Sequence, residues 1–321
     1  MMMLMGLSET QWVHTAMIAL IIALFSFLVR SWTFRNDRFQ WIPVLGVTAI
    51  AISMVALIIS LFLRSLAAEY FALSNMYESM LVLIIGVQLG FLLLDRWFKL
   101  PHLGWPVALL LIVALTFDVS LPTEIKPLQA ALQSYWRSIH VPIIILSYAM
   151  FTLAFLSSII SLFKLYFAPG NASSTVQQPI PAVEGPNTER VSMIQLSQGL
   201  SSGLPASLSG QAAGELSEAS LYDELTYRCV AFGFPLLAIG IILGGLWANE
   251  AWGNYWSWDP KESMSLVTLL GYGVYLHLRV NGEHSPKILA WVSVAGYALM
   301  LITYFGVNLM GLGLHSYGKI G

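Results

Sequence analysis

The chain has 321 residues, of which 57% are hydrophobic and 10% are charged, whereas charged residues make up about a quarter of a typical soluble domain. This composition excludes a soluble globular protein and indicates a polytopic membrane protein, and the net charge of −2 argues against nucleic acid as a partner. The single cysteine, Cys229, excludes an internal disulfide and a Cys-x-x-Cys thiol-reductase mechanism. We expect no cleaved signal peptide, because the first apolar run is too long and lacks a small-residue cleavage site.

A transmembrane helix needs about 20 mostly apolar residues, and several segments of the sequence approach that length. They are residues 12–29, 43–63, 77–94, 103–119, 140–163, 229–248, 264–280 and 287–310. The fourth is the weakest, because Pro106 lies inside it and Asp118 near its end, although proline is tolerated in the first turn of a helix. The sequence therefore predicts an all-α integral membrane protein, a polytopic bundle of about eight transmembrane helices.

The basic residues are distributed unevenly between the two sides of this predicted bundle. Ten of the 15 Lys and Arg residues fall on the side that carries the odd-numbered connections, and five fall on the other side. Arg190 lies in a long loop, and when it is omitted the same side still carries more basic residues. Because basic residues accumulate in cytoplasmic loops, the side with the odd-numbered connections is predicted to be cytoplasmic. His140, His315 and residues 247–262 then lie on the outer side.

The outer connection over residues 120–139 has apolar residues at spacings of three and four, which favours an amphipathic helix lying in the membrane interface. These residues are Leu128, Leu132, Tyr135, Trp136 and Ile139. Pro142 suits the first turn of the fifth transmembrane helix. It therefore places His140 near the beginning of that helix, at the membrane surface.

The third transmembrane helix begins within Ser74-Asn75-Met76-Tyr77-Glu78-Ser79. One interpretation is structural, since Ser74 or Asn75 can cap a helix in which Glu78 completes a capping box. The other is functional, since groups at the positive end of a helix can contact the carboxylates of a ligand. The sequence leaves both open.

Residues 165–227 form a connection on the predicted cytoplasmic side that is rich in Ser, Gly, Pro, Ala and Gln. We expect much of it to be flexible, with a short helix over residues 221–227 that leads into the sixth span. The chain thus divides into five transmembrane helices in residues 1–164, this loop, and three helices in residues 228–321. No chemistry is assigned to the loop.

Residues 247–262 are too polar, and too interrupted by Gly253 and Pro260, to span a membrane. Their aromatic residues are Trp247, Trp252, Tyr255, Trp256 and Trp258. An interfacial belt is the ordinary reason for aromatic residues at a membrane surface, but a belt spreads them over many helix ends. The local density favours a platform that covers a large flat ligand.

Six histidines are present, and a neutral imidazole is a common ligand of haem iron. His140 and His315 both lie at the predicted outer boundary beside the aromatic segment, where one on each face of a haem would give bis-imidazole ligation. An interfacial role without a ligand fits their positions equally well. His277 lies inside the apolar seventh segment, where an ionisable residue indicates function unless it bonds to a neighbouring helix. The others, His14, His102 and His284, are expected to be interfacial or solvated.

Asp259, Lys261 and Glu262 end the aromatic segment. Lys261 can pair with a haem propionate, and Asp259 can orient a ring or receive a proton. The alternative is a solvated Asp-Pro turn in which Glu262 caps the next helix. We favour the capping role for Glu262 and leave Asp259 open.

The segment Trp252-Gly-Asn-Tyr-Trp-Ser-Trp-Asp-Pro-Lys-Glu262 resembles the tryptophan-rich WWD signature of the haem-handling membrane proteins of cytochrome c assembly. Within that group it is most similar to the CcsA (ResC-like) branch of system II. Further stretches match this branch in the expected order, namely Ser74 to Ser79, Tyr275 to His277 and Gly313 to Gly318. The resemblance covers the chain from residue 12 onward, apart from the loop 165–227. The family signature continues into Thr-Trp, where this chain has Ser263-Met264.

The resemblance implies the haem-handling subunit of a CcsB-CcsA cytochrome c synthetase, which delivers haem b and attaches it to apocytochrome c at the outer face. His140 and His315 match the axial ligands of an external haem site. His277 matches an intramembrane haem ligand, and because this sequence offers no obvious second buried histidine, a CcsB-type partner is expected to supply the other ligand.

The same resemblance implies that the aromatic segment covers the haem, through Trp252, Tyr255, Trp256, Trp258 and Asp259. It also implies haem transport and the formation of covalent haem-thioether bonds by the synthetase. Whether this subunit is itself an enzyme stays open. Such proteins occur in cyanobacterial and chloroplast thylakoid membranes and in bacterial plasma membranes, and the cyanobacterial thylakoid is favoured here.

Two other functional classes remain as alternatives. A membrane transporter with an aromatic outer vestibule is the first, although transporters commonly show paired repeats and no internal repeat is visible in this sequence. A quinone-linked redox subunit with a permanent haem is the second. It would more often place paired histidines on helices in the membrane core, whereas the candidate pair here is external.

Overall fold

The computed structural model describes residues 8–33, 41–98, 100, 102–167, 210–282 and 284–306, with the backbone alone for residues 32, 33 and 210–218. This part of the chain is helical and contains no strand. The long helices are α1 (Glu9–Thr33), α2 (Trp41–Ala68), α3 (Met76–Phe98), α4 (Gly104–Val119), α5 (Tyr135–Phe167), α7 (Gly210–Trp252), α8 (Pro260–Asn281) and α9 (Pro286–Leu301). Two short turns complete it, the 3-10 turn η3 (Ala130–Leu132) and the π-helical turn η4 (Ile302–Gly306).

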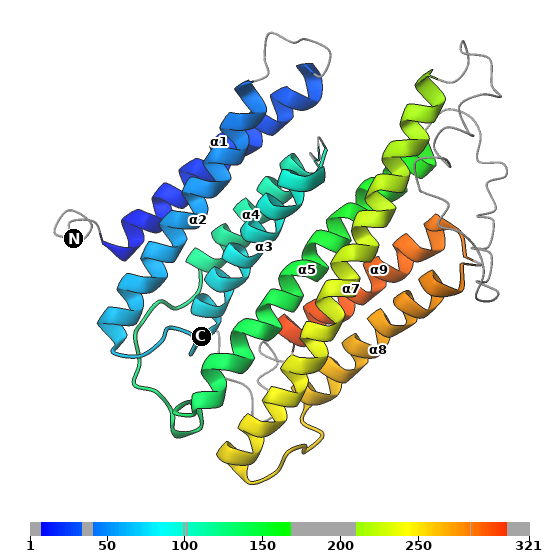
Figure 1. The fold of residues 1–321 in the computed structure, drawn as a ribbon. Coiled ribbons are helices and arrows are strands. Elements are labelled where there is room, and N and C mark those ends of the chain that lie inside the picture. Colours follow the sequence, from blue (N-terminus) through cyan, green and yellow to red (C-terminus); the bar gives the residue numbers. More distant parts are fainter. Residues whose placement is uncertain are drawn as a thin grey trace, which may run out of the picture.

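The predicted fold class, an all-α polytopic membrane protein, is confirmed. Each of the first seven predicted spans lies within one helix, to within a residue, although most of these helices extend beyond the predicted ends. The eighth covers α9 and η4, and its residues 307–310 lie outside the described part of the chain. Six of the described helices are long and apolar enough to cross a membrane, while α4 is a shorter apolar helix. Figure 1 shows α1 and α2 packed at one edge of the bundle, α3 to α5 in the middle, and α7 to α9 at the other edge.

The first four helices pack around the ring of Phe27, which is fully buried. The ring meets Phe91 of α3 edge-on at 5.8 Å between centroids. It lies against two glycines, Gly46 of α2 and Gly104 of α4, where an added Cβ would stand 2.9 Å and 2.6 Å from ring atoms. Small residues let helices approach closely in a membrane protein, and here they make room for one aromatic ring.

The two long helices α5 and α7 lie side by side and form the main contact between the halves of the bundle (Figure 1). Glycines on one face of α7 receive side chains of α5: Gly233 faces Phe151, and Gly244 faces His140. An added Cβ at either position would stand 2.7 Å from a ring carbon. The close approach of these helices therefore depends on the absence of a side chain at both glycines.

The prediction of an amphipathic helix over residues 120–139 is wrong. Residues 122–129 have no regular structure, η3 follows, and α5 already begins at Tyr135. Proline at 122 and 127 disfavours helix in this segment. Its carbonyl groups also bind side chains instead of helix N–H groups, since Arg64 donates to the Thr123 carbonyl at 2.9 Å and Tyr70 to the Lys126 carbonyl at 3.0 Å.

Because α5 begins earlier than predicted, His140 is in its second turn rather than beside its cap, and Pro142 is inside the helix rather than in its first turn. A proline has no N–H group, so the carbonyl of Ser138 lacks its helical donor. His140 therefore lies in a short N-terminal portion of α5, separated from the rest of the helix by this proline.

The short helix predicted over residues 221–227 is helical, but it is part of the long helix α7, which begins at Gly210, and not a separate element. Tyr222 and Leu225 are buried in the bundle. Asp223 forms an ion pair with Arg279 of α8, and the Tyr222 hydroxyl accepts the His102 N–H at 3.2 Å. This portion of the connection is thus packed, while residues 168–209 lie outside the described residues.

We predict that Gly104→Ala lowers the thermal unfolding midpoint of the detergent-solubilised protein. The new methyl group would overlap the Phe27 ring, and overpacking of this kind costs about 1–3 kcal/mol. Gly273→Ala is the matched control, because its Cβ would meet only Phe234, at an ordinary 3.6 Å. The helical preference of alanine should leave that midpoint unchanged or raised. Equal midpoints for the two variants would contradict this account of the packing.

Candidate functional site

One end of the bundle gathers the last residues of α2, α4 and α7 and the first residues of α3, α5 and α8 (Figure 1, lower part). We call it the aromatic end, because it carries residues 247–262. A cavity of about 150 Å³ opens there between α3, α5, α7 and α8. Polar and aromatic side chains share its lining, among them Ser74, Asn75, Arg137, His140, Trp256 and Lys261.

The ring of His140 is held in this cavity by two neighbours. Its Nδ1 lies 2.7 Å from the carbonyl oxygen of Gly240. Because a carbonyl can only accept, Nδ1 carries the proton, and a neutral ring then has its lone pair on Nε2. The ring also packs against Trp247 at 5.7 Å between centroids, and Gly244 leaves space beside Cε1.

The tryptophan-rich segment is part helix and part loop. α7 continues to Trp252, and the connection to α8 begins at Gly253, whose φ of 80° is in the left-handed region that favours glycine. Trp258 has a φ of 58°, which is uncommon for a residue with a side chain. These two positions turn the chain back toward the bundle, and Ser263 bonds the Trp258 carbonyl at 3.3 Å.

The aromatic residues of this segment have different surroundings. Trp247 is buried and donates its indole N–H to the Ala131 carbonyl at 2.8 Å. Tyr255 and Trp258 are 61% and 71% exposed. Trp247, Tyr255 and Trp256 line the cavity, whereas Trp252 packs on Trp247 at 5.6 Å and Trp258 meets Trp256 edge-on at 5.8 Å. The segment is therefore a layered cluster and not a flat surface.

Asp259 and Glu262 form a capping box at the beginning of α8. The Asp259 carboxylate accepts the Lys261 N–H at 2.9 Å, and Glu262 accepts the N–H groups of Ser257 at 2.8 Å and Asp259 at 3.2 Å. The capping role predicted for Glu262 is confirmed. Asp259 is the N-cap residue and is buried, and it does not line the cavity.

The beginning of α3 is capped in a similar way. Asn75 accepts the Glu78 N–H at 2.9 Å, and Glu78 accepts the N–H and hydroxyl of Ser74 at 2.6 and 2.8 Å. The capping interpretation of this stretch is therefore correct. Ser74 and Asn75 also line the cavity, so the cap fixes part of its wall.

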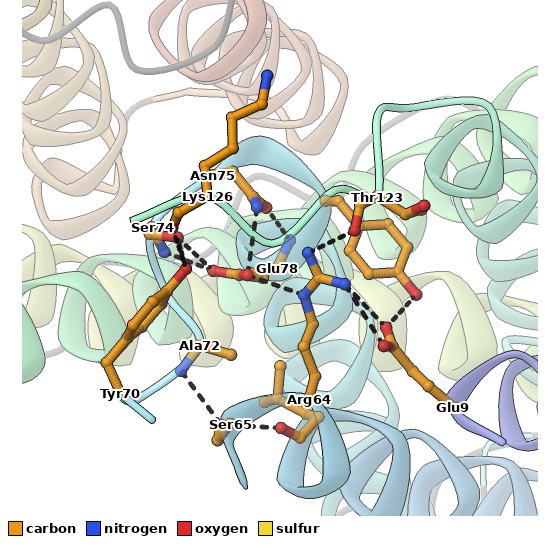
Figure 2. Close-up of polar contacts among 12 residues, drawn as sticks. Glu9, Arg64, Ser65, Tyr70, Ala72, Ser74, Asn75, Glu78, Thr123 and Lys126 are labelled. Atoms are coloured by element: carbon orange, nitrogen blue, oxygen red, sulfur yellow. Dashed lines mark hydrogen bonds and ion pairs between the residues drawn. The ribbon is translucent and has the colours of Figure 1, made fainter. Parts of the chain in front are cut away.

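A buried arginine, which the sequence patterns did not single out, holds this cap. Figure 2 shows the Arg64 guanidinium between the carboxylates of Glu78 and Glu9. Arg64 is 1% exposed; its Nε lies 2.8 Å from Glu78, and its Nη1 lies 3.2 Å from Glu9. A third bond runs to the Thr123 carbonyl. One side chain thus joins α1, α2, α3 and the segment after α4.

Two cations face the cavity. Arg137 extends from the first turn of α5 and Lys261 from the first turn of α8. Burial lowers the pKa of the Lys261 ammonium to about 8, against the opposing effect of the Asp259 carboxylate. Lys261 is therefore charged at neutral pH and loses its charge under mildly alkaline conditions.

Among the described residues, the candidate His277 does not line this cavity. His277 lies near the far end of α8, exposed on the surface of the chain, with Nε2 3.1 Å from the Asn281 amide nitrogen. His315 lies outside the described residues. His14 is exposed on α1.

A second cavity, of about 390 Å³ and almost wholly apolar, lies between α3, α4, α5 and α9. Tyr304 lines both cavities. It belongs to the π-helical turn η4, and its hydroxyl lies 2.8 Å from that of Ser79. This hydrogen-bonded tyrosine forms a shared wall between the polar and the apolar space.

The fold and this site define a multi-pass helical membrane protein with an aromatic, cationic cavity at one end of the bundle. Residues 73–315 match the family described as cytochrome C assembly protein, and the chain belongs to this family. The resemblance seen in the sequence motifs is thereby confirmed.

Curated relatives match over nearly the whole chain. A cytochrome c biogenesis protein CcsA of Mesostigma viride is 34% identical, with 97% of each chain covered. That of Cyanophora paradoxa is 37% identical over 89% of this chain and 90% of its own. Among solved structures, a cytochrome c haem lyase CcmF has a TM-score of 0.58 at 15% identity, covering 92% of this chain and 46% of that one. This last likeness shows a shared fold.

We predict that Arg64→Met strongly lowers the thermal midpoint, because it leaves Glu78, which is 0% exposed, without its counter-charge. Breaking a buried pair in this way costs about 3–5 kcal/mol. Arg228→Met is the control, since its pair with Glu224 is largely solvent-accessible and such pairs contribute about 0–1 kcal/mol. A midpoint for Arg64→Met as high as that of the control would show that the buried network does not stabilise the fold.

Proposed function

We propose that this protein handles haem in cytochrome c biogenesis, as the CcsA-type subunit that holds haem b for covalent attachment to apocytochrome c. The observation that supports the proposal is the orientation of His140 in the cavity, where the bond from Nδ1–H to the Gly240 carbonyl makes Nε2 the ring nitrogen that carries the lone pair a metal would bind. Donation from the second ring nitrogen to a carbonyl is the usual way in which a protein orients a histidine ligand and raises its basicity.

The surroundings of His140 suit a large, flat ligand with acidic groups. Trp247, Tyr255 and Trp256 line the same cavity, so they supply aromatic surface for a porphyrin. Lys261 supplies a positive charge for a propionate. Trp252 and Trp258 pack on these aromatic residues. We propose that they cover the haem from outside the cavity.

In this proposal His140 and His315 ligate the iron from opposite faces. Asp259 fixes the beginning of α8 through its cap and so the position of Lys261. The apocytochrome then presents its Cys-x-x-Cys-His segment at the aromatic end. Each thiol S–H adds across one vinyl group of the haem, forming a carbon–sulfur bond and placing the proton on the other vinyl carbon, so no oxidant is required. The contribution of the chain is to position the haem and to control its ligation.

We further propose that haem reaches this cavity from the cytoplasmic side by way of His277. Because His277 is exposed on the surface of the chain, a second subunit of the CcsB type can approach it and supply the opposite ligand. The aromatic end then faces the lumen or periplasm, in accordance with the distribution of basic residues, and a cyanobacterial thylakoid membrane is the proposed location.

We predict that His140→Ala abolishes holocytochrome c formation and removes the bis-histidine haem spectrum of the purified protein, because Nε2 is the proposed iron ligand. His315→Ala should have the same effect. His14→Ala is the matched control, because His14 is an exposed histidine near the beginning of α1. That end of α1 also carries Glu9, which pairs with Arg64. The measurements are the visible absorption spectrum and the yield of haem-stained cytochrome c, with protein amount in the membrane checked in each case.

Normal cytochrome c in both the His140 and His315 variants would refute the assignment of the external ligands. No haem in the wild-type protein, purified with its partner under haem-replete conditions, would refute the proposed function as a whole.

Haem binding should also depend on pH through Lys261. Below a pH of about 8 the Lys261 ammonium is charged and attracts a propionate, and this charge is lost as the pH rises through about 8. The affinity for haem should therefore fall about tenfold, which is the effect of one charge-assisted hydrogen bond. Lys261→Arg keeps its charge above this range and should abolish the fall. A pH titration of haem affinity from 6.5 to 9.5 checks this, and identical profiles for both proteins would contradict it.

A further inference from the structure

A second cation in the cavity, Arg137, has no role in the function proposed above. We infer that Arg137 binds a carboxylate of the ligand that occupies this cavity. This inference rests on the proposed function, in which that carboxylate is a haem propionate. Arg137 then selects haem whose propionates are free acids.

The first argument is the unmet hydrogen bonding of a buried guanidinium. Arg137 is 4% exposed, and it donates from Nη1 to the Phe71 carbonyl at 3.3 Å. Its Nε has no hydrogen-bond partner among the described residues. A buried donor without an acceptor costs about 1–3 kcal/mol. This cost is offset when a ligand supplies the acceptor, and Arg137 lines the cavity where a ligand would lie.

The second argument is its position relative to His140. The two residues are three apart on α5, so they lie on the same face of the helix, about 4.5 Å apart along its axis. Both line the cavity. A ligand held by His140 is therefore within reach of the guanidinium, whose planar fork matches the two oxygens of a carboxylate.

The third argument is the charge around the cavity. Glu78 is the carboxylate that acts electrostatically on Arg137, but Glu78 is already bound by Arg64 and by Ser74. The carboxylate of Glu262 on the opposite wall accepts backbone N–H groups in its helix cap. With Arg137 and Lys261 the described lining of the cavity carries an excess of positive charge, which an acidic ligand complements.

Arg137 also anchors the connection between α2 and α3 through the Phe71 carbonyl. A purely structural role would predict that its loss weakens every ligand alike. The carboxylate role predicts instead that its loss weakens only ligands with free carboxylates. The experiment therefore compares two ligands that differ in this group alone.

We would measure the affinity of the full-length protein for haem and for haem dimethyl ester, in which both propionates are esterified, by absorption titration. The wild-type protein should prefer the free acid. Arg137→Gln should reduce that preference about tenfold, the effect of one charge-assisted hydrogen bond, and leave the affinity for the ester unchanged, which also shows that the variant is folded. Arg137→Lys, which keeps the charge without the fork, should retain part of the preference. Lys126→Gln, at an exposed cation of the same end, should behave as wild type.

Two results would overturn the inference while haem binding itself persists. One is an unchanged preference in both Arg137 variants, and the other is an equal loss of affinity for haem and ester, which would make Arg137 a loop anchor only. A wild-type protein that binds neither form would instead refute the proposed function, and with it the ligand on which the inference rests.

Discussion

The buried ion pair between Arg64 and Glu78 determines the shape of the aromatic end. Glu78 holds Ser74 and caps α3, while Arg64 reaches Glu9 and the Thr123 carbonyl (Figure 2). Four segments that are far apart in the sequence therefore meet at one guanidinium. A charge taken out of water at this depth is tolerated only when all its bonds are satisfied, so the network favours a single arrangement of the cavity wall.

The contact between α5 and α7 serves packing and ligand orientation at once. The absence of a side chain at Gly244 brings α7 close to α5 and leaves space for the imidazole of His140. The carbonyl of Gly240 then selects the protonation of Nδ1. Because this acceptor is a backbone group, its position is set by the helix itself, and the orientation of the ring follows from how closely the helices pack.

The sequence was sufficient for the helices and the family, because spans of about 20 apolar residues and a dense aromatic motif are local signals. It failed over residues 120–139, where carbonyls bonded by Arg64 and Tyr70 replace the predicted helix. Arg64 was missed because its partners Glu9 and Glu78 are 55 and 14 residues away and on other helices, so a periodic pattern within one helix does not connect them. A useful signal would have been that Glu9, Arg64 and Glu78 all lie at the same end of three successive helices.

Pro142 separates the first two turns of α5 from the rest of the helix. The portion before it carries Arg137 and His140, and it is joined to the rest of the helix by one hydrogen bond fewer than an uninterrupted helix would have. Bending is easiest at such a point. The turn that presents both cavity residues can therefore tilt as a unit without disturbing the membrane-buried remainder of α5, and the two side chains keep their mutual spacing when it does.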